Sequence, residues 1–232
     1  MAILNHLSRA AFLTVVALVA ARPAFAQTAA WDSTFRPASY EIKVQQFRSY
    51  PNSPNDVIFL GNSITAGTDW NELLGSISVR NRGISGDITF GVLDRLDEVT
   101  EGKPSKVFIL IGINDISRNV PDEVILSNYR KIIRRIRSGS PETRIFCQTL
   151  LPVNSSFGKF KNHYGKDEHI LNVNRQLKVL ARDENVTLID LHPAFLDQEG
   201  RLQQELTHDG LHLTAAGYRR WADLLVRDGY LK

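Results

Sequence analysis

The sequence is poor in several features that define other classes of protein. Cys147 is the only cysteine in 232 residues, so no disulfide can form within the chain. The apolar run of residues 10–21 is too short to span a bilayer comfortably, and no internal repeat or linker-like stretch divides the rest. These absences argue against a disulfide-stapled scaffold, a repeat array and a membrane anchor, and they predict one domain with a substantial core.

The N-terminus has the pattern of an export signal. A basic start that includes Arg9 precedes the apolar run, and Ala24-Phe25-Ala26 offers the small-x-small site that signal peptidase needs. We expect residues 1–26 to be a signal peptide and residues 27–232 to be the working domain, in the periplasm or outside a bacterial cell. No cysteine stands near the cleavage site, so we expect no lipid anchor.

Removal of that segment leaves almost no net charge. Of the 28 Lys and Arg, two lie in residues 1–26 with no acidic residue, so 26 remain against 25 Asp and Glu. A chain this close to neutral lacks the electrostatic footprint of a nucleic-acid-binding protein. We therefore expect no nucleic-acid partner, and the sequence carries no signal for an oligomeric state.

Five short strand-like segments, most of them apolar, alternate with helical patterns. Strands are expected at Val57–Leu60, Val79–Gly83, Lys106–Gly112, Arg144–Leu151 and Val186–Leu191, and helices at 37–50, 64–74, 88–99, 121–138, 168–183 and 214–225. The first helix should turn Ile42, Val44 and Phe47 inward. Strands that are apolar throughout indicate a parallel sheet covered on both faces. The predicted fold is a single-domain, three-layer α/β/α sandwich with a five-stranded, flavodoxin-like sheet.

Polar motifs follow the expected strands at the edge where such sheets bind ligands. They are Gly61-Asn62-Ser63, Gly83-Ile84-Ser85-Gly86-Asp87, Gly112-Ile113-Asn114-Asp115 and His208-Asp209-Gly210-Leu211-His212. Acyl transfer needs a nucleophile, a base, a carboxylate that orients the base, and donors for the developing oxyanion. These loops hold residue types for each role.

Ser63 is the candidate nucleophile, with an N-cap for the following helix as the alternative. His212 is the candidate base, and Asp209, three residues earlier, would hold its other ring nitrogen. His208 is a rival base and Asp190 a rival acid. No glycine stands two residues after Ser63, which distinguishes this serine from the nucleophile elbow of the α/β-hydrolases.

Together the four blocks make the chain resemble the SGNH, or GDSL-like, hydrolase family from about Asp56 to Gly217. Members are esterases, lipases, thioesterases and carbohydrate deacetylases, and the branch that looks nearest includes platelet-activating-factor acetylhydrolase-like and sialate O-acetylesterase-like proteins. The resemblance implies catalytic roles for Ser63, Asp209 and His212. It also implies an oxyanion hole formed by the backbone N–H groups of Ser63 and Gly86 and by the Asn114 amide.

The chain departs from the family at Asn62, where Asp is usual. The amide keeps the shape and an acceptor but removes a charge, and we expect activity to survive because Asp209 is the triad acid. We place Asn62 with Asp87, His163 and Tyr164 as substrate-binding residues. The loop 154–164 mixes aromatic and hydrogen-bonding side chains that suit a sugar ring, although a plain solvated loop is the alternative.

The sequence predicts a serine esterase that removes a short acyl group, acetyl above all, from a small-molecule or glycan ester. The scattered His and Asp residues show no ligand spacing, so no metal and no cofactor are expected. A lysophospholipase or thioesterase on the same residues is the alternative. A carbohydrate-binding relative without turnover and an acyltransferase are further alternatives.

Overall fold

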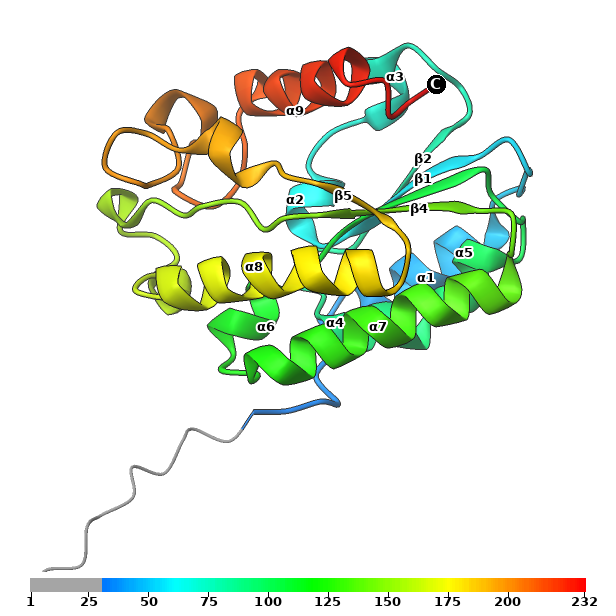
Figure 1. Ribbon diagram of the computed structural model, residues 1–232, viewed down its shortest axis with the longest axis horizontal. Coiled ribbons are helices and arrows are strands. Elements are labelled where there is room, and N and C mark those ends of the chain that lie inside the picture. The colour runs from blue at the N-terminus through cyan, green and yellow to red at the C-terminus, as the bar shows by residue number, and fades with distance from the viewer. Residues whose placement is uncertain (1–30) are drawn as a thin grey trace, which may run out of the picture. The chain divides into compact units, whose positions relative to one another are not determined.

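A five-stranded sheet lies at the centre of the computed structural model, which describes residues 31–232 (Figure 1). The strands are β1 (Val57–Gly61), β2 (Val79–Gly83), β3 (Lys106–Leu110), β4 (Arg144–Gln148) and β5 (Thr187–Ile189). All neighbouring pairs are parallel and their order is β2-β1-β3-β4-β5, as in flavodoxin. The predicted fold is therefore confirmed, whereas the predicted cleavage after Ala26 lies outside the described residues.

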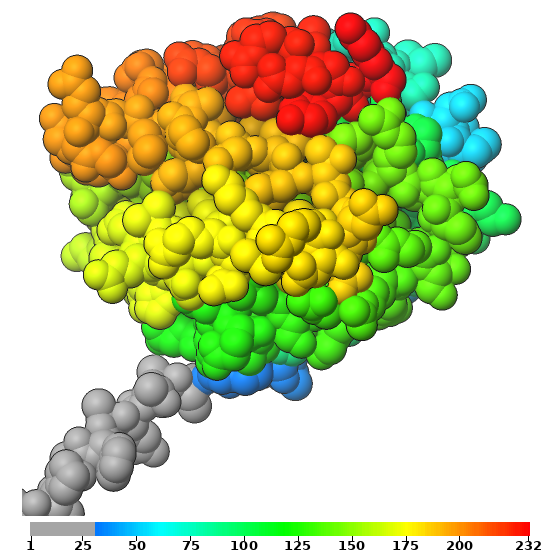
Figure 2. All heavy atoms as spheres, viewed as in Figure 1, coloured from blue at the N-terminus to red at the C-terminus, as the bar shows by residue number. Residues whose placement is uncertain are grey.

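Helices cover the sheet on both faces, and α3 and α9 lie on the face opposite α1, α4, α5, α7 and α8 (Figure 1). The helices are α1 (Tyr40–Ser49), α2 (Ser63–Ala66), α3 (Trp70–Leu74), α4 (Thr89–Asp94), α5 (Leu96–Thr100), α6 (Ile113–Ser117), α7 (Asp122–Gly139), α8 (Asp167–Asp183) and α9 (Ala215–Arg227). Short 3₁₀ turns occur at Ser155–Phe157, Lys161–His163, His192–Phe195 and Gln204–Leu206. In the space-filling view, the atoms of α7 (green) and α8 (yellow) lie against each other (Figure 2).

Three sequence predictions fail in detail. The helix expected over 88–99 is divided into α4 and α5, because Arg95 between them leaves the helical conformation with φ −116° and ψ 16°. The helix expected over 64–74 is two short helices, because Asp69 caps a new helix at Trp70 by accepting the backbone N–H of Asn71. Ile42 does not face inward: its side chain is 62% exposed, whereas Val44 and Phe47 are buried as expected. The buried face of α1 therefore runs along Tyr40, Val44 and Phe47 at helical spacing.

Stacked aromatic rings form the core on the α9 side of the sheet. Phe59 of β1 and Phe108 of β3 stand opposite each other in register, and their ring centroids are 4.9 Å apart. Phe108 stacks in turn on Phe146 of β4 at 4.5 Å. Trp70 of α3 covers Phe59 at 4.0 Å. These large rings bury much apolar area across three strands, so the strand ends that carry the polar loops rest on a close-packed base.

No helix within residues 31–232 combines the length and the apolar character needed to cross a bilayer. Cys147 lies on β4 with its side chain fully buried, and burial raises the pKa of its thiol to about 12. The side chain therefore packs as a small apolar group in the core.

Candidate functional site

A cavity of about 540 Å³ opens where the carboxyl ends of β1, β2 and β3 meet the loops after β4 and before α9. It is lined by Ser63, Ser85, Gly86, Asn114, Ser117, Arg118, Phe160, Asn162, His163, Leu211 and His212. This is the edge at which doubly wound sheets bind ligands. The lining includes the serine, the histidine, the glycine and the asparagine that the sequence analysis singled out.

Ser63 stands at the first position of α2, directly after the turn that ends β1. The side-chain oxygen of Asn62 accepts the backbone N–H of Ile64 at 3.0 Å, so Asn62 caps the helix and Ser63 does not. Asn62 therefore supplies the cap that an aspartate could supply. Gly61 is required before it, because a Cβ there would collide with the Leu110 carbonyl oxygen on β3. The Ser63 hydroxyl is left free for the cavity.

A chain of hydrogen bonds joins Ser63 to His212 and Asp209. His212 Nε2 lies 2.9 Å from Ser63 Oγ, and His212 Nδ1 lies 2.7 Å from Asp209 Oδ2. A carboxylate only accepts, so Nδ1 carries the proton and Nε2 presents its lone pair to the serine hydroxyl. This network assigns the tautomer in which the imidazole can take the serine proton.

Asp209 is itself held by its own loop. Its Oδ1 accepts the backbone N–H groups of Leu211 at 3.0 Å and His212 at 2.8 Å. Burial alone raises the pKa of Asp209, but hydrogen bonds from the His212 ring and these N–H groups outweigh it, and the pKa lies below its ordinary value. The carboxylate therefore stays ionised beside the imidazole.

The Asn114 amide faces the same cavity from the start of α6. Its Nδ2 donates to the backbone carbonyl of Asp87 at 2.9 Å, and its Oδ1 lies 3.1 Å from His163 Nε2. A carbonyl oxygen only accepts, so the nitrogen of the amide must be the atom that faces Asp87. The second Nδ2 proton has no partner among residues 31–232 and remains available to a ligand.

His163 fixes the other half of this amide. Since Asn114 Oδ1 accepts, His163 Nε2 must carry a proton, and Nδ1 of a neutral ring is then an acceptor. That Nδ1 is buried and has no hydrogen-bond partner among the described residues. Burial, with the nearby His212 and Arg118, lowers the pKa of His163 from 6.5 to about 4. His163 is thus a neutral donor to Asn114 at physiological pH.

Two backbone N–H groups complete the set of donors that the cavity can offer. Gly86 adopts φ +82°, a left-handed conformation that favours glycine, at the cavity wall. Within residues 31–232, the N–H groups of Ser63 and Gly86 donate to no other residue. Ser63, Gly86 and Asn114 all line the cavity, so these two N–H groups and the Asn114 amide are the donors available to an oxyanion there.

The structure places three of the four residues that were predicted to bind substrate outside the lining of the cavity. Asn62 and Asp87 are buried, and neither lines the cavity. Tyr164 does not line it either, because its hydroxyl accepts the backbone N–H groups of Lys159 and Phe160 and so braces the loop after β4. Of the four, only His163 faces the cavity.

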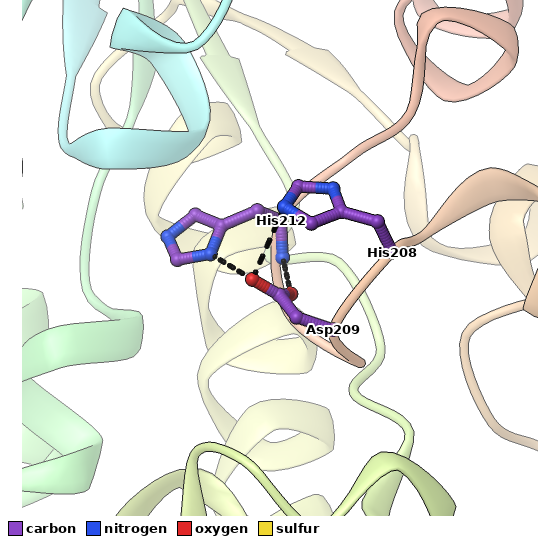
Figure 3. A group of neighbouring side chains, drawn as sticks. All are labelled: His208, Asp209 and His212. Carbon is purple, nitrogen blue, oxygen red and sulfur yellow. Dashed lines mark hydrogen bonds and ion pairs between the residues drawn. The ribbon is translucent and has the colours of Figure 1, made fainter.

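Of the two rival residues, Asp190 lies away from the Asp209–His212 pair and His208 lies next to it. Asp190 lies outside the cavity and pairs with Lys178 at 2.8 Å, so it is not a partner of His212. His208, the rival base, does reach the carboxylate of Asp209: its Nε2 lies 3.3 Å from Asp209 Oδ2 (Figure 3). Its ring is largely exposed and lies 6.2 Å from the ring of His212.

His208, Asp209 and His212 also form the one group in the described part of the chain that could hold a metal ion. Their ligand atoms lie within 4.8 Å of one another. The sequence analysis found no metal-ligand spacing among the His and Asp residues and so did not predict this group. The shared oxygen, however, already accepts the His212 Nδ1 proton, so an ion there would have to displace that proton. The group therefore suits orientation of His212 better than metal binding.

Arg95 is a supporting residue that the sequence analysis missed. It is fully buried, and its guanidinium donates to the backbone carbonyls of Gly61 at 3.2 Å and Arg82 at 2.9 Å. It also pairs with Asp87 at 3.1 Å. Burial raises the pKa of Asp87 to about 6, against the attraction of Arg95. Arg95 thus links the ends of β1 and β2 to the loop that carries Gly86. The sequence signal that could have identified it is its position among the apolar residues of 88–99, where helical spacing puts it on the buried face.

Comparison with known proteins agrees with this geometry. The model of the GDSL-like Lipase/Acylhydrolase family matches residues 59–220, so the chain belongs to this family of ester-cleaving hydrolases. Platelet-activating factor acetylhydrolase IB subunit alpha2 of Rattus norvegicus is 31% identical over 172 residues, which cover 71% of this chain and 72% of that relative.

Solved structures show the same fold. A protein of Streptococcus pneumonia, provisionally named a platelet activating factor, superposes with a TM-score of 0.76 at 32% identity over 84% of this chain and 93% of that chain. An acetylxylan esterase from Geobacillus stearothermophilus superposes with a TM-score of 0.61 at 22% identity, over 76% of this chain and 94% of that chain. The latter likeness is one of fold alone.

Proposed function

We propose that this acylhydrolase is an exported serine esterase that removes acetyl groups from a carbohydrate. The observation that carries the proposed chemistry is the unbroken chain from Ser63 Oγ through His212 to Asp209, with bond lengths of 2.9 and 2.7 Å. The cavity beside it has hydroxyl and amide groups from Ser85, Ser117 and Asn162, which suit a sugar better than an acyl tail.

In the proposed reaction His212 Nε2 takes the proton of Ser63 as Oγ attacks the ester carbonyl. The negative charge on the carbonyl oxygen is met by the N–H groups of Ser63 and Gly86 and by the free Nδ2 proton of Asn114. His212 then returns the proton to the departing sugar oxygen, which leaves an acetyl-serine. Water, activated by the same imidazole, releases acetate and restores Ser63.

A short acyl group is supported by two observations. Two apolar side chains, Phe160 and Leu211, line the cavity among mostly polar residues. The rat relative is named an acetylhydrolase. Export is supported by the pattern of residues 1–26 alone, and N-terminal sequencing of the protein from a periplasmic fraction should begin at Gln27.

The proposal is tested by acetate release from a panel of acetylated glycans, with wild type and Ser63→Ala compared. Acetate release by wild type and its loss in Ser63→Ala are expected. Equal release by both proteins would refute the nucleophile, and failure of a fluorophosphonate probe to label Ser63 would favour a binding protein without turnover. Added alcohol acceptors would reveal an acyltransferase through a transferred acetyl product.

A lysophospholipase or thioesterase is the second candidate, and it uses the same residues. Hydrolysis of p-nitrophenyl acetate and of p-nitrophenyl palmitate separates the two. We expect the acetate ester to be strongly preferred because only two apolar side chains, Phe160 and Leu211, line the cavity to receive an acyl tail. A preference for the palmitate ester would contradict the proposed acetylesterase.

A further inference from the structure

Arg118 is the one formally charged side chain besides histidine in the lining of the cavity. The lining includes no Asp or Glu, and Asp209 lies behind the His212 ring, where it accepts the Nδ1 proton. Arg118 forms no ion pair and donates no side-chain hydrogen bond to any residue in 31–232. Its N–H groups are therefore available to a ligand in the cavity.

The position of Arg118 follows from that of Asn114. Arg118 directly follows the last residue of α6, and its backbone N–H donates to the Asn114 carbonyl at 3.2 Å, as at i, i+4 in a helix. Residues with this spacing share one face, so the Arg118 side chain lies on the same side of α6 as the oxyanion amide. The fold thus places a cation beside the proposed reaction centre.

Phe35 holds the guanidinium in place. The Cζ atom of Arg118 lies 3.2 Å from the centroid of the Phe35 ring. Stacking on a ring occupies one face of the guanidinium and leaves its N–H edge free, and this edge matches a carboxylate or a phosphate. The charge of Arg118 also contributes to the lowered pKa of His163, which places the cation close to the other wall of the cavity.

From this arrangement we propose that the substrate is an acetyl ester of an anionic sugar, whose carboxylate or phosphate is bound by Arg118. The inference rests on the proposed acetylesterase function and narrows its substrate class. An acetyl group carries no charge, so the anion must belong to the alcohol portion, which leaves with its oxygen when the Ser63 ester forms. An unpaired arginine in a cavity without carboxylates would favour such a substrate over its neutral counterpart.

The test compares matched substrates on the same enzyme preparation. One pair is acetylated methyl glucuronide against acetylated methyl glucoside, and a second pair is acetylated glucose phosphate against acetylated glucose. We expect wild type to show the higher kcat/KM for the anionic member of at least one pair. The ratio of kcat/KM for the anionic substrate to that for its neutral counterpart measures this preference, and the pair with the larger ratio shows whether the bound anion is a carboxylate or a phosphate. In Arg118→Gln the ratio should fall about fivefold, the upper range for a partly exposed ion pair.

Matched variants keep the test independent of folding. A ratio measured on one preparation cancels any loss of folded protein. Arg219→Gln removes the same charge from the exposed side of α9, away from the cavity, and should leave the ratio as in wild type. Arg118→Glu should reverse the preference. Added salt should reduce the wild-type ratio, because it screens an exposed charge.

The results separate this inference from the function on which it rests. A wild-type ratio near one in both pairs, or the same ratio in Arg118→Gln as in wild type, would overturn the role of Arg118 while the esterase stands. Hydrolysis of neither sugar ester would also overturn it. Loss of p-nitrophenyl acetate hydrolysis in Ser63→Ala would then still support the esterase chemistry, and an equal rate in both proteins would refute it.

Discussion

Two histidines reach the cavity from different loops, and the surroundings give them opposite properties. His212 faces Ser63 and has the Asp209 carboxylate 2.7 Å from its Nδ1. His163 faces the Asn114 amide, has no carboxylate partner among the described residues, and is held neutral with a pKa of about 4. The same side chain therefore suits a proton carrier in one place and a fixed hydrogen-bond donor in the other, and the neighbouring group makes the difference.

The largest effect is expected when His212 is replaced. His212→Gln removes the group that takes the Ser63 proton, so kcat/KM for p-nitrophenyl acetate should fall about 10⁶-fold, as when a triad histidine is lost elsewhere. His169→Gln is the matched control, because His169 is exposed on α8 and pairs with Asp122. Activity of His212→Gln within tenfold of wild type would show that another base is used.

Removal of the carboxylate tests why the two histidines differ. Asp209→Asn keeps the side-chain shape but can place a donor against His212 Nδ1, which favours the wrong tautomer. We expect kcat to fall about 10⁴-fold. Asp190→Asn is the control, since Asp190 lies outside the cavity. Equal losses in both variants would refute the assignment of Asp209 as the orienting acid.

A smaller loss is expected at His163, because it acts through Asn114. His163→Leu frees the amide to turn, so kcat should fall about 10²-fold, near the cost of one oxyanion donor, with little change in KM. His163→Gln retains an N–H that can reach Asn114 Oδ1 and should recover most of kcat. If the Gln and Leu variants lose equal activity, the loss does not come from the hydrogen bond between His163 and Asn114 Oδ1.

The protonation of His163 can be observed directly. Nitrogen NMR should show its ring as the neutral Nε2–H tautomer, titrating near pH 4. A folded-state pKa below the ordinary 6.5 means that the unfolded chain binds the proton first. Stability from neutral His163 is therefore present above pH 6.5 and is lost as the pH falls towards 4. A urea series from pH 7 to pH 4 should show less loss in His163→Leu than in wild type.

The smallest effect is expected at His208. It contacts Asp209 at 3.3 Å, but its ring is largely exposed and Asp209 has three other hydrogen bonds within its own loop. His208→Gln should change kcat by no more than about twofold, as for an exposed ion pair. A loss that approaches that of Asp209→Asn would make His208 a second positioning residue for the carboxylate.

Much of this protein could be predicted from local pattern. The apolar strands, their order in an α/β sheet and the polar residues after each strand are visible because burial on both faces demands continuous apolar segments. The pairing of Asp209 with His212 is likewise local, since three residues separate them. Thr214 begins the last helix as expected, and its hydroxyl accepts the Gly217 N–H.

What could not be predicted depends on contacts between distant segments. Asp87 and Asn62 look like site residues in sequence, yet packing buries Asp87 against Arg95 and turns Asn62 into a helix cap. Arg118 directly follows the short helix α6 and belongs to no recognisable motif, and only the cavity shows where it points. The contact of His163 with Asn114 joins the loop after β4 to helix α6 across 49 residues of sequence.

The sequence by itself determined the fold class, the family and the residues suited to act as nucleophile, acid and base, because periodicity and short motifs are properties of neighbouring residues. Only the tertiary structure decided which polar groups face the cavity and which are buried behind it. The tertiary structure also decided that His212 faces a carboxylate and that His163 is held neutral beside the Asn114 amide. Burial and hydrogen-bond partners control protonation, and both are set by segments that meet only when the chain is folded.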